Sequence, residues 1–111
     1  MDIGKTYPGL TLSDEIAQAL EAAAVCKAAA FRSERLYKRT YAQVLLMITD
    51  AKTVAEREAR TLVTQVVIRA EDDWISAQTA WNIAQAKADG LQVRFEEWRS
   101  RNATARAEMK L

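Results

Sequence analysis

Residues 63–109 read VTQVVIRAEDDWISAQTAWNIAQAKADGLQVRFEEWRSRNATARAEM. Alternating steps of four and three residues through this stretch meet an apolar side chain everywhere except at Asn102. An α-helix repeats every ~3.6 residues, so this alternation places the side chains in one continuous stripe on one face. The stripe consists of Val63, Val67, Ala70, Trp74, Ala77, Trp81, Ala84, Ala88, Leu91, Phe95, Trp98, Asn102, Ala105 and Met109. We therefore expect a long helix that buries this stripe, with all three tryptophans, against the rest of the chain.

The distribution of glycine and proline favours a few long helices. Gly9 and Gly90 enclose eighty residues that include neither type. Hairpin turns and loops usually need glycine or proline, so this distribution disfavours sheets. Alanine runs at residues 22–24 and 28–30 add strong helix propensity. The expected fold class is all-α.

A first long helix is expected over residues 12–49, after an irregular arm at residues 1–10. Thr11 and Asp14 have the spacing of a capping box, which marks a helix start. The apolar stripe of this helix is interrupted by Lys27 and Glu34. It comprises Ile16, Leu20, Ala23, Lys27, Ala30, Glu34, Tyr37, Tyr41, Val44 and Ile48.

A different face of the same helix offers a second interpretation. Ala24, Ala28 and Phe31 share this face, which could seat a second copy of the chain. A dimer built in that way would be a four-helix bundle and would bury more of each helix than a single hairpin.

The break between the long helices lies near residues 50–53. Thr53 followed by Glu56 is a second capping-box pattern, so a short helix is expected over residues 54–62 and a third over 63–107. The alternative is a continuous helix with a kink near Arg60. Gly90 interrupts the third pattern and indicates a close backbone approach, a kink or a break.

These segments predict a single domain over residues 11–111, a long antiparallel, coiled-coil-like helical hairpin with a short helix at its tip. Antiparallel folding around that tip pairs residues whose numbers sum to about 113. Tyr41 then approaches Trp74, and Ala30 approaches Trp81. Burial of that kind would make replacement of Trp81 or Trp98 by alanine cost roughly 3–5 kcal/mol.

Composition disfavours several functional classes. A net charge of +1 gives no general attraction to nucleic acid or to anionic membranes. The lone Cys26 fits a small buried residue in a reducing cytosol, and neither a signal-peptide core nor a long uncharged apolar span is present. We expect a cytoplasmic protein that does not enter a membrane.

The chain also lacks the residue patterns of common active sites. It has no histidine, no glycine-rich phosphate loop and no pair of cysteines. Glu71, Asp72 and Asp73 are consecutive, and consecutive helical side chains point about 100° apart, so they do not converge on one ion. We expect no enzyme activity, no catalytic residue, no cofactor and no metal site.

Two basic clusters are the candidate contact residues. The first comprises Arg32, Arg35, Lys38 and Arg39. It could bind phosphates, but the antiparallel register brings it beside residues 71–73, so charge pairing between the helices is the simpler expectation. The second cluster flanks Trp98 and could bind single-stranded nucleic acid if that ring were exposed for stacking. It comprises Arg94, Arg99, Arg101 and Arg106, with Lys110 nearby.

Residues 52–59 read KTVAEREA. This segment resembles a motif of small, alanine- and arginine-rich helical proteins from bacteriophages, in which a KTVAEREA-like turn joins two long helices. The resemblance implies a phage-encoded accessory protein that acts near DNA recombination or host defence, and it carries no catalytic or binding residue to this chain.

We therefore expect a non-enzymatic protein that docks on a nucleic-acid-processing or defence complex of the host, such as a nuclease or a CRISPR effector. Tyr37 and Trp74 would join the docking surface if they lie outside the helix–helix seam. Two alternatives are a DNA-binding recombination accessory protein and a structural coiled coil of a virion or scaffold.

Overall fold

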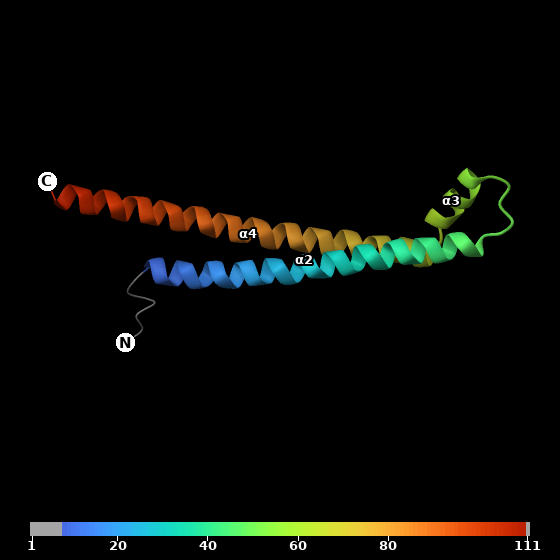
Figure 1. Ribbon diagram of the computed structural model, residues 1–111, viewed down its shortest axis with the longest axis horizontal. Helices are drawn as coiled ribbons and strands as arrows, with labels where there is room; N and C mark the ends of the chain where they lie inside the picture. Colours follow the sequence, from blue (N-terminus) through green and yellow to red (C-terminus); the bar gives the residue numbers. More distant parts are fainter. Residues whose placement is uncertain (1–7, 111) are drawn as a thin grey trace. The chain divides into compact units, whose positions relative to one another are not determined.

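The computed structural model describes residues 8–110, and the side chains of residues 11–110. Three helices follow one another: α2 (Pro8–Met47), α3 (Val54–Leu62) and α4 (Gln65–Met109). No strand occurs within the described range. The chain is an all-α helical hairpin with the short α3 at the turn, as the sequence predicts (Figure 1).

The first helix starts earlier than expected. The irregular arm was predicted to reach residue 10, whereas α2 begins at Pro8. Proline suits the first helical position because it lacks the N–H that would be unsatisfied there and its φ is already helical. The rest of the predicted arm, residues 1–7, lies outside the described residues. The other helix ends fall within about two residues of their predicted positions, and α3 spans the predicted residues.

The contacts of the chain group into two compact units, here called unit 1 and unit 2. Unit 1 comprises Met1–Ala24 and Asn82–Leu111, and unit 2 comprises Val25–Trp81. Each unit contains one stretch of α2 packed against one stretch of α4, and unit 2 also contains α3.

The apolar stripe of α4 is covered over most of its predicted length. Its members from Val67 to Trp98 are all buried or half-buried. Its two ends contradict the prediction: Val63 is 70% exposed, and the stripe is exposed from Asn102 to Met109, which is 86% exposed. Val63 precedes α4, and Figure 1 shows the C-terminal end of α4 running past the start of α2 in unit 1.

Eight of the ten positions in the predicted inner stripe of α2 are buried or half-buried. They are Ile16, Ala23, Ala30, Glu34, Tyr37, Tyr41, Val44 and Ile48. The two exceptions are Leu20 and Lys27, which are exposed, and in each case the residue before it, Ala19 or Cys26, is covered instead. At these two positions a small side chain faces α4 in place of a longer one.

Unit 1 has a small aliphatic core. Ala19 packs with Ala88 and Leu91, and Ile16 covers the group from the start of α2. Three of these four side chains are 0–7% exposed. Alanines let two helices approach closely, but each contributes little apolar area to the free energy of folding.

Gly90 marks neither a helix break nor a close backbone approach, two of the features that the sequence suggested for it. The helix α4 continues through it without a break, so the predicted division into two helices does not occur. A Cβ atom built at this exposed glycine would meet nothing within 4 Å, which also removes a close backbone approach as the reason for it. Within the described residues, no helix combines the length and the apolar character that crossing a membrane requires.

Candidate partner-binding surfaces

Aromatic rings form the seam of unit 2. Tyr37 of α2 stacks on Trp74 of α4, with ring centroids 5.3 Å apart. Phe31 meets Trp81 edge-on at 5.7 Å, and the Lys27 ammonium lies 5.8 Å from both of those ring centroids. Pairs of this kind contribute about 0.5–1.5 kcal/mol beyond the area that they bury.

Tyr37 and Trp74 are therefore seam residues and not an external docking surface. Both are half-buried, and each covers a face of the other's ring. The indole Nε1 of Trp74 is buried and has no hydrogen-bond partner in the described part of the chain. An unsatisfied buried donor typically costs about 1–3 kcal/mol, so this stack is retained despite a penalty.

The Glu71 carboxylate accepts a hydrogen bond from the Tyr37 phenol. Burial, the negative charge of Glu71 and a hydrogen bond donated by the phenol to that carboxylate all raise the pKa of Tyr37 above its ordinary 10.0, and burial has the largest effect. The neutral phenol is thereby favoured, because ionisation would place a second negative charge beside the first. Glu71 thus serves the seam.

The first basic cluster does not pair with residues 71–73. The ion pairs of the described chain are Lys38–Glu34 at 2.9 Å, Arg60–Asp50 at 2.9 Å and Arg99–Glu96 at 3.4 Å. The predicted pairing between the helices is wrong, because Lys38 bonds to a glutamate one turn away on its own helix. Arg32, Arg35 and Arg39 are exposed and form no ion pair with the described residues.

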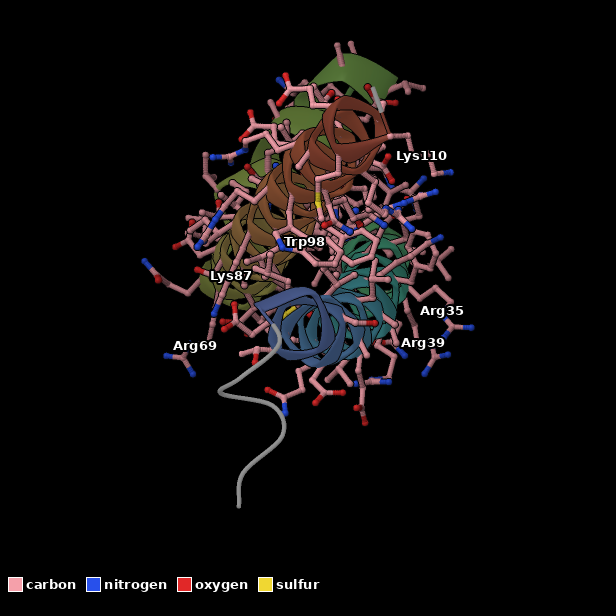
Figure 2. All side chains as sticks on the ribbon, turned by 90° about the vertical axis from the view of Figure 1, so that its left-hand side faces the viewer. Arg35, Arg39, Arg69, Lys87, Trp98 and Lys110 are labelled. Atoms are coloured by element: carbon pink, nitrogen blue, oxygen red, sulfur yellow. The ribbon has the colours of Figure 1, made fainter. Side chains whose placement is uncertain are left out.

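These three arginines belong to a regular surface that the sequence reading missed. Alternating steps of three and four residues place them on one outer side of α2, with exposed apolar residues at either end. We call this surface the outer arginine face; it consists of Val25, Ala28, Arg32, Arg35, Arg39, Ala42 and Leu46. Figure 2 shows Arg35 and Arg39 extending together from one side of unit 2, while Arg69 extends from the other. The three- and four-residue spacing of the outer arginine face can be found in the sequence. It identifies an outer surface only once the residues of α2 that face α4 are known.

The second basic cluster lies on the C-terminal part of α4 in unit 1. Arg94, Arg99, Arg101 and Arg106 are all exposed. Trp98 is half-buried and stacks on Phe95 at 5.9 Å, and Arg99 lies 6.0 Å from the centroid of the Phe95 ring. Trp98 is not a free stacking platform. Beside this pair a shallow hollow opens, lined in part by Asn102 and Arg106.

The KTVAEREA segment builds the tip of unit 2. The Thr53 hydroxyl accepts from the Glu56 N–H at 3.1 Å, and the Glu56 carboxylate accepts from the Lys52 N–H at 2.9 Å. Arg57 Nε donates to the carbonyl of Leu45 at the end of α2, at 2.7 Å. The motif thus caps α3 and fastens it to α2, which is a structural task.

Figure 1 places α3 at the turn between α2 and α4. Arg60 bonds to Asp50 in the connecting segment, and this bond lowers the pKa of Asp50 below its ordinary 3.8. The fully buried Thr61 donates its hydroxyl to the carbonyl of Arg57. The bond between Arg60 and Asp50 joins the last turn of α3 to the segment that follows α2, whereas the Thr61 bond lies within α3.

Over residues 8–110 no group of three or more cysteine and carboxylate side chains could hold a metal ion. Cys26 is half-buried on the inner face of α2. No protein-family model, no curated protein and no solved structure matches the chain.

Proposed function

We propose that this protein is a non-enzymatic, phage-encoded interaction protein that docks in the host cytoplasm on a complex that processes nucleic acid or defends the cell. A nuclease or a CRISPR effector would be such a complex. The docking surface is the outer arginine face of unit 2, and the target is an acidic protein surface. The phage origin rests on the resemblance of residues 52–59, and the docking mode rests on the geometry of α2.

The composition of the outer arginine face carries this proposal. Arg32, Arg35 and Arg39 have no ion pair in the described chain, so their guanidinium groups are available to an external carboxylate, which arginine binds through two parallel hydrogen bonds. Val25 and Leu46 at the two ends are 63% and 71% exposed. Protein interfaces combine arginine with apolar residues, whereas a surface that only binds phosphates gains little from apolar ends.

The test is a pull-down from host lysate with a charge-reversed variant. The wild-type chain should recover a defined nucleic-acid-processing complex and alter its activity. The triple variant Arg32→Glu, Arg35→Glu, Arg39→Glu should lose both effects, because like charges at an interface repel. Arg69→Glu is the matched control, since Arg69 is an exposed arginine of the same unit on the other side. Equal recovery by wild type and triple variant would rule out this surface.

Direct nucleic-acid binding through the second basic cluster is the other candidate. Its support is that Arg94, Arg101 and Arg106 are exposed and form no ion pair with the described residues. Binding of that kind would weaken steeply with salt and would be lost in an Arg101→Glu, Arg106→Glu variant. A gel shift with single- and double-stranded oligonucleotides at low salt tests it, and the absence of any shift would eliminate it. Large regular assemblies in light scattering would instead favour a structural coiled coil.

A further inference from the structure

The side of α4 that faces away from α2 carries a second regular stripe in unit 1. Alternating steps of three and four residues through residues 83–100 meet only exposed positions. This outer stripe consists of Ile83, Ala86, Gly90, Val93, Glu97 and Ser100. It lies roughly 160° around the helix from Ala88 and Leu91, which pack against Ala19 of α2. Ile83 and Val93 are 66% and 58% exposed, so the apolar part of the outer stripe is uncovered.

Charged residues border the outer stripe, and each border has one sign. The acidic border comprises Asp89 and Glu96, each directly before a stripe position, and Asn82 holds the corresponding position one heptad earlier. The basic border comprises Lys87, Arg94 and Arg101, each directly after a stripe position. All of these side chains are exposed. In a coiled coil these are the positions whose charges decide the partner helix and its orientation.

The two borders do not pair with each other within the helix. Asp89 and Arg94 are five residues apart, as are Glu96 and Arg101, so about 140° around α4 separates the two members of each couple. Ion pairs along one helix need a spacing of three or four residues. Neither couple forms an ion pair in the described chain. Five residues is instead the offset at which the border positions of two parallel helices meet in a heptad pattern.

Other contacts inside unit 1 do not explain the borders. Glu96 has only an exposed 3.4 Å contact with Arg99, and Asp89 accepts a hydrogen bond from the Gln85 amide at 3.0 Å. Two members of the basic border share a groove with Glu15 of α2, and neither forms an ion pair with it. The charges of both borders are therefore available to a partner outside the chain.

We propose that the outer stripe binds the outer stripe of a second copy of the chain, with the two α4 helices parallel and in register. Ile83 contacts Ile83 of the partner subunit, and Val93 contacts Val93 of the partner subunit. The small residues Ala86 and Gly90 lie between these contacts and do not obstruct the approach of the two helices. The helix α2 does not interfere, because it packs on the other side of α4.

The charges select both the partner and the orientation. In the parallel dimer, Asp89 faces Arg94 of the partner subunit and Glu96 faces Arg101 of the partner subunit, and two-fold symmetry repeats both pairs. In an antiparallel dimer each border would face its own copy, so that acid would oppose acid and base would oppose base. A parallel second copy therefore supplies the complement of both borders at once.

The dimer should be one that dissociates on dilution. Its apolar contacts are few, its ion pairs are exposed, and Glu97 lies in the stripe opposite Glu97 of the partner subunit. The proposal does not depend on the outer arginine face, which belongs to unit 2, and it stands or falls separately from the docking function.

Sedimentation equilibrium of the full chain with charge-reversed borders tests this dimer. The wild-type chain should associate reversibly, with a Kd that rises with salt. The variants Arg94→Glu, Arg101→Glu and Asp89→Arg, Glu96→Arg should each raise the Kd at least about tenfold, because each border then meets its own sign. An equimolar mixture of the two variants should associate with near wild-type affinity. The fourfold variant that combines all these changes should also regain self-association, because its borders are exchanged and again complementary.

Two matched controls separate the outer stripe from the rest of unit 1. Arg99→Glu, Arg106→Glu makes the same change in net charge on a different side of α4 and should leave the Kd within about twofold. Glu97→Leu removes the like-charge contact and should lower the Kd at least about tenfold, whereas Glu21→Leu, at an exposed position of α2, should not change it.

Several results would overturn the proposal. A wild-type chain that stays monomeric up to about 1 mM would do so, as would a fourfold variant that stays monomeric although circular dichroism shows it to be helical. An equal loss of association in the Arg99→Glu, Arg106→Glu control would show that overall charge governs association. If Arg94→Glu, Arg101→Glu abolishes an oligonucleotide gel shift and leaves self-association unchanged, the basic border binds nucleic acid instead.

Discussion

In both units a stretch of α2 packs against a stretch of α4, but the side chains between the two helices differ. In unit 2, large rings from both helices meet across the seam, as in the Tyr37–Trp74 stack, and α3 is bonded to α2 through Arg57. In unit 1 the core consists mainly of alanines with Ile16 and Leu91, and its ring pair, Phe95–Trp98, lies on a single helix. Rings that meet across a seam stabilise the association of two helices, whereas a pair on one helix mainly stabilises that helix. Unit 2 should therefore be the more stable of the two.

The largest expected effect is the loss of a tryptophan from the seam of unit 2. Trp81→Ala removes the contact with Phe31 and leaves a gap between the helices, which should lower the free energy of unfolding by roughly 3 kcal/mol. Trp98→Ala in unit 1 should cost less, about 1–2 kcal/mol, because its ring partner is on its own helix. Urea unfolding of both variants measures the difference. Equal losses would mean that the two units depend equally on their tryptophans.

The bond between Arg57 and Leu45 should matter next. Arg57→Ala leaves the carbonyl of Leu45 with only the longer, 3.4 Å bond from the Ile48 N–H, and should cost about 0.5–1.5 kcal/mol. Arg60→Ala is the matched control, since it removes only an exposed pair with Asp50 and should cost less than about 1 kcal/mol. Thermal unfolding monitored by circular dichroism compares the two. A larger loss from Arg60→Ala would show that the tip is held by its surface charges.

Unit 1 offers a stabilising substitution. Gly90→Ala should raise the free energy of unfolding by about 0.5–1 kcal/mol, because glycine is a poor helix former and the added methyl group meets no atom within 4 Å. Ala86→Gly, at an exposed position one turn earlier, should lower stability by a similar amount and serves as the reciprocal control. A destabilised Gly90→Ala variant would reveal a contact that the isolated chain lacks, such as one with a partner.

The smallest expected effect concerns pH. Because the folded state raises the pKa of Tyr37, the stability that this shift contributes is fully present below the unfolded pKa of about 10 and is lost as the pH rises through the folded pKa. Near-ultraviolet absorbance should show one tyrosine that ionises late, and Tyr37→Phe should remove that phase. Glu71→Gln should lower the pKa of Tyr37 without restoring its ordinary value, since burial is the larger cause. An alkaline titration that is the same in the wild type and in Tyr37→Phe, apart from the loss of one group at its ordinary pKa, would contradict this account.

Periodicity predicted the helices and most of the seam. The stripe of α4 was correct from Val67 to Trp98, and the residue range of α3 followed from the capping pattern at Thr53 and Glu56. These features are local, since they depend on spacing along one helix and on hydrogen bonds within one turn. Local patterns of this kind can be recognised without knowledge of the tertiary structure.

The errors arose where the outcome depended on a partner helix. Lys27 and Cys26 differ by one residue, and only the packing against α4 decides which of them faces inward. Packing also decides that the ring that stacks on Trp74 is that of Tyr37, one turn before Tyr41, the residue that was expected to approach it. Lys38 is a different case, because its bond to Glu34, four residues earlier on the same helix, is a local pair that the spacing could have predicted.

Residue-resolved hydrogen exchange tests the contrast between the two units most directly. We predict that backbone amides of residues 67–81 exchange slowest, that those around Ala88 and Leu91 exchange faster, and that those of residues 102–109 exchange fastest of the three. Equal protection across these three stretches, or the slowest exchange in residues 102–109, would contradict the conclusion that aromatic packing makes unit 2 the stable part of the molecule.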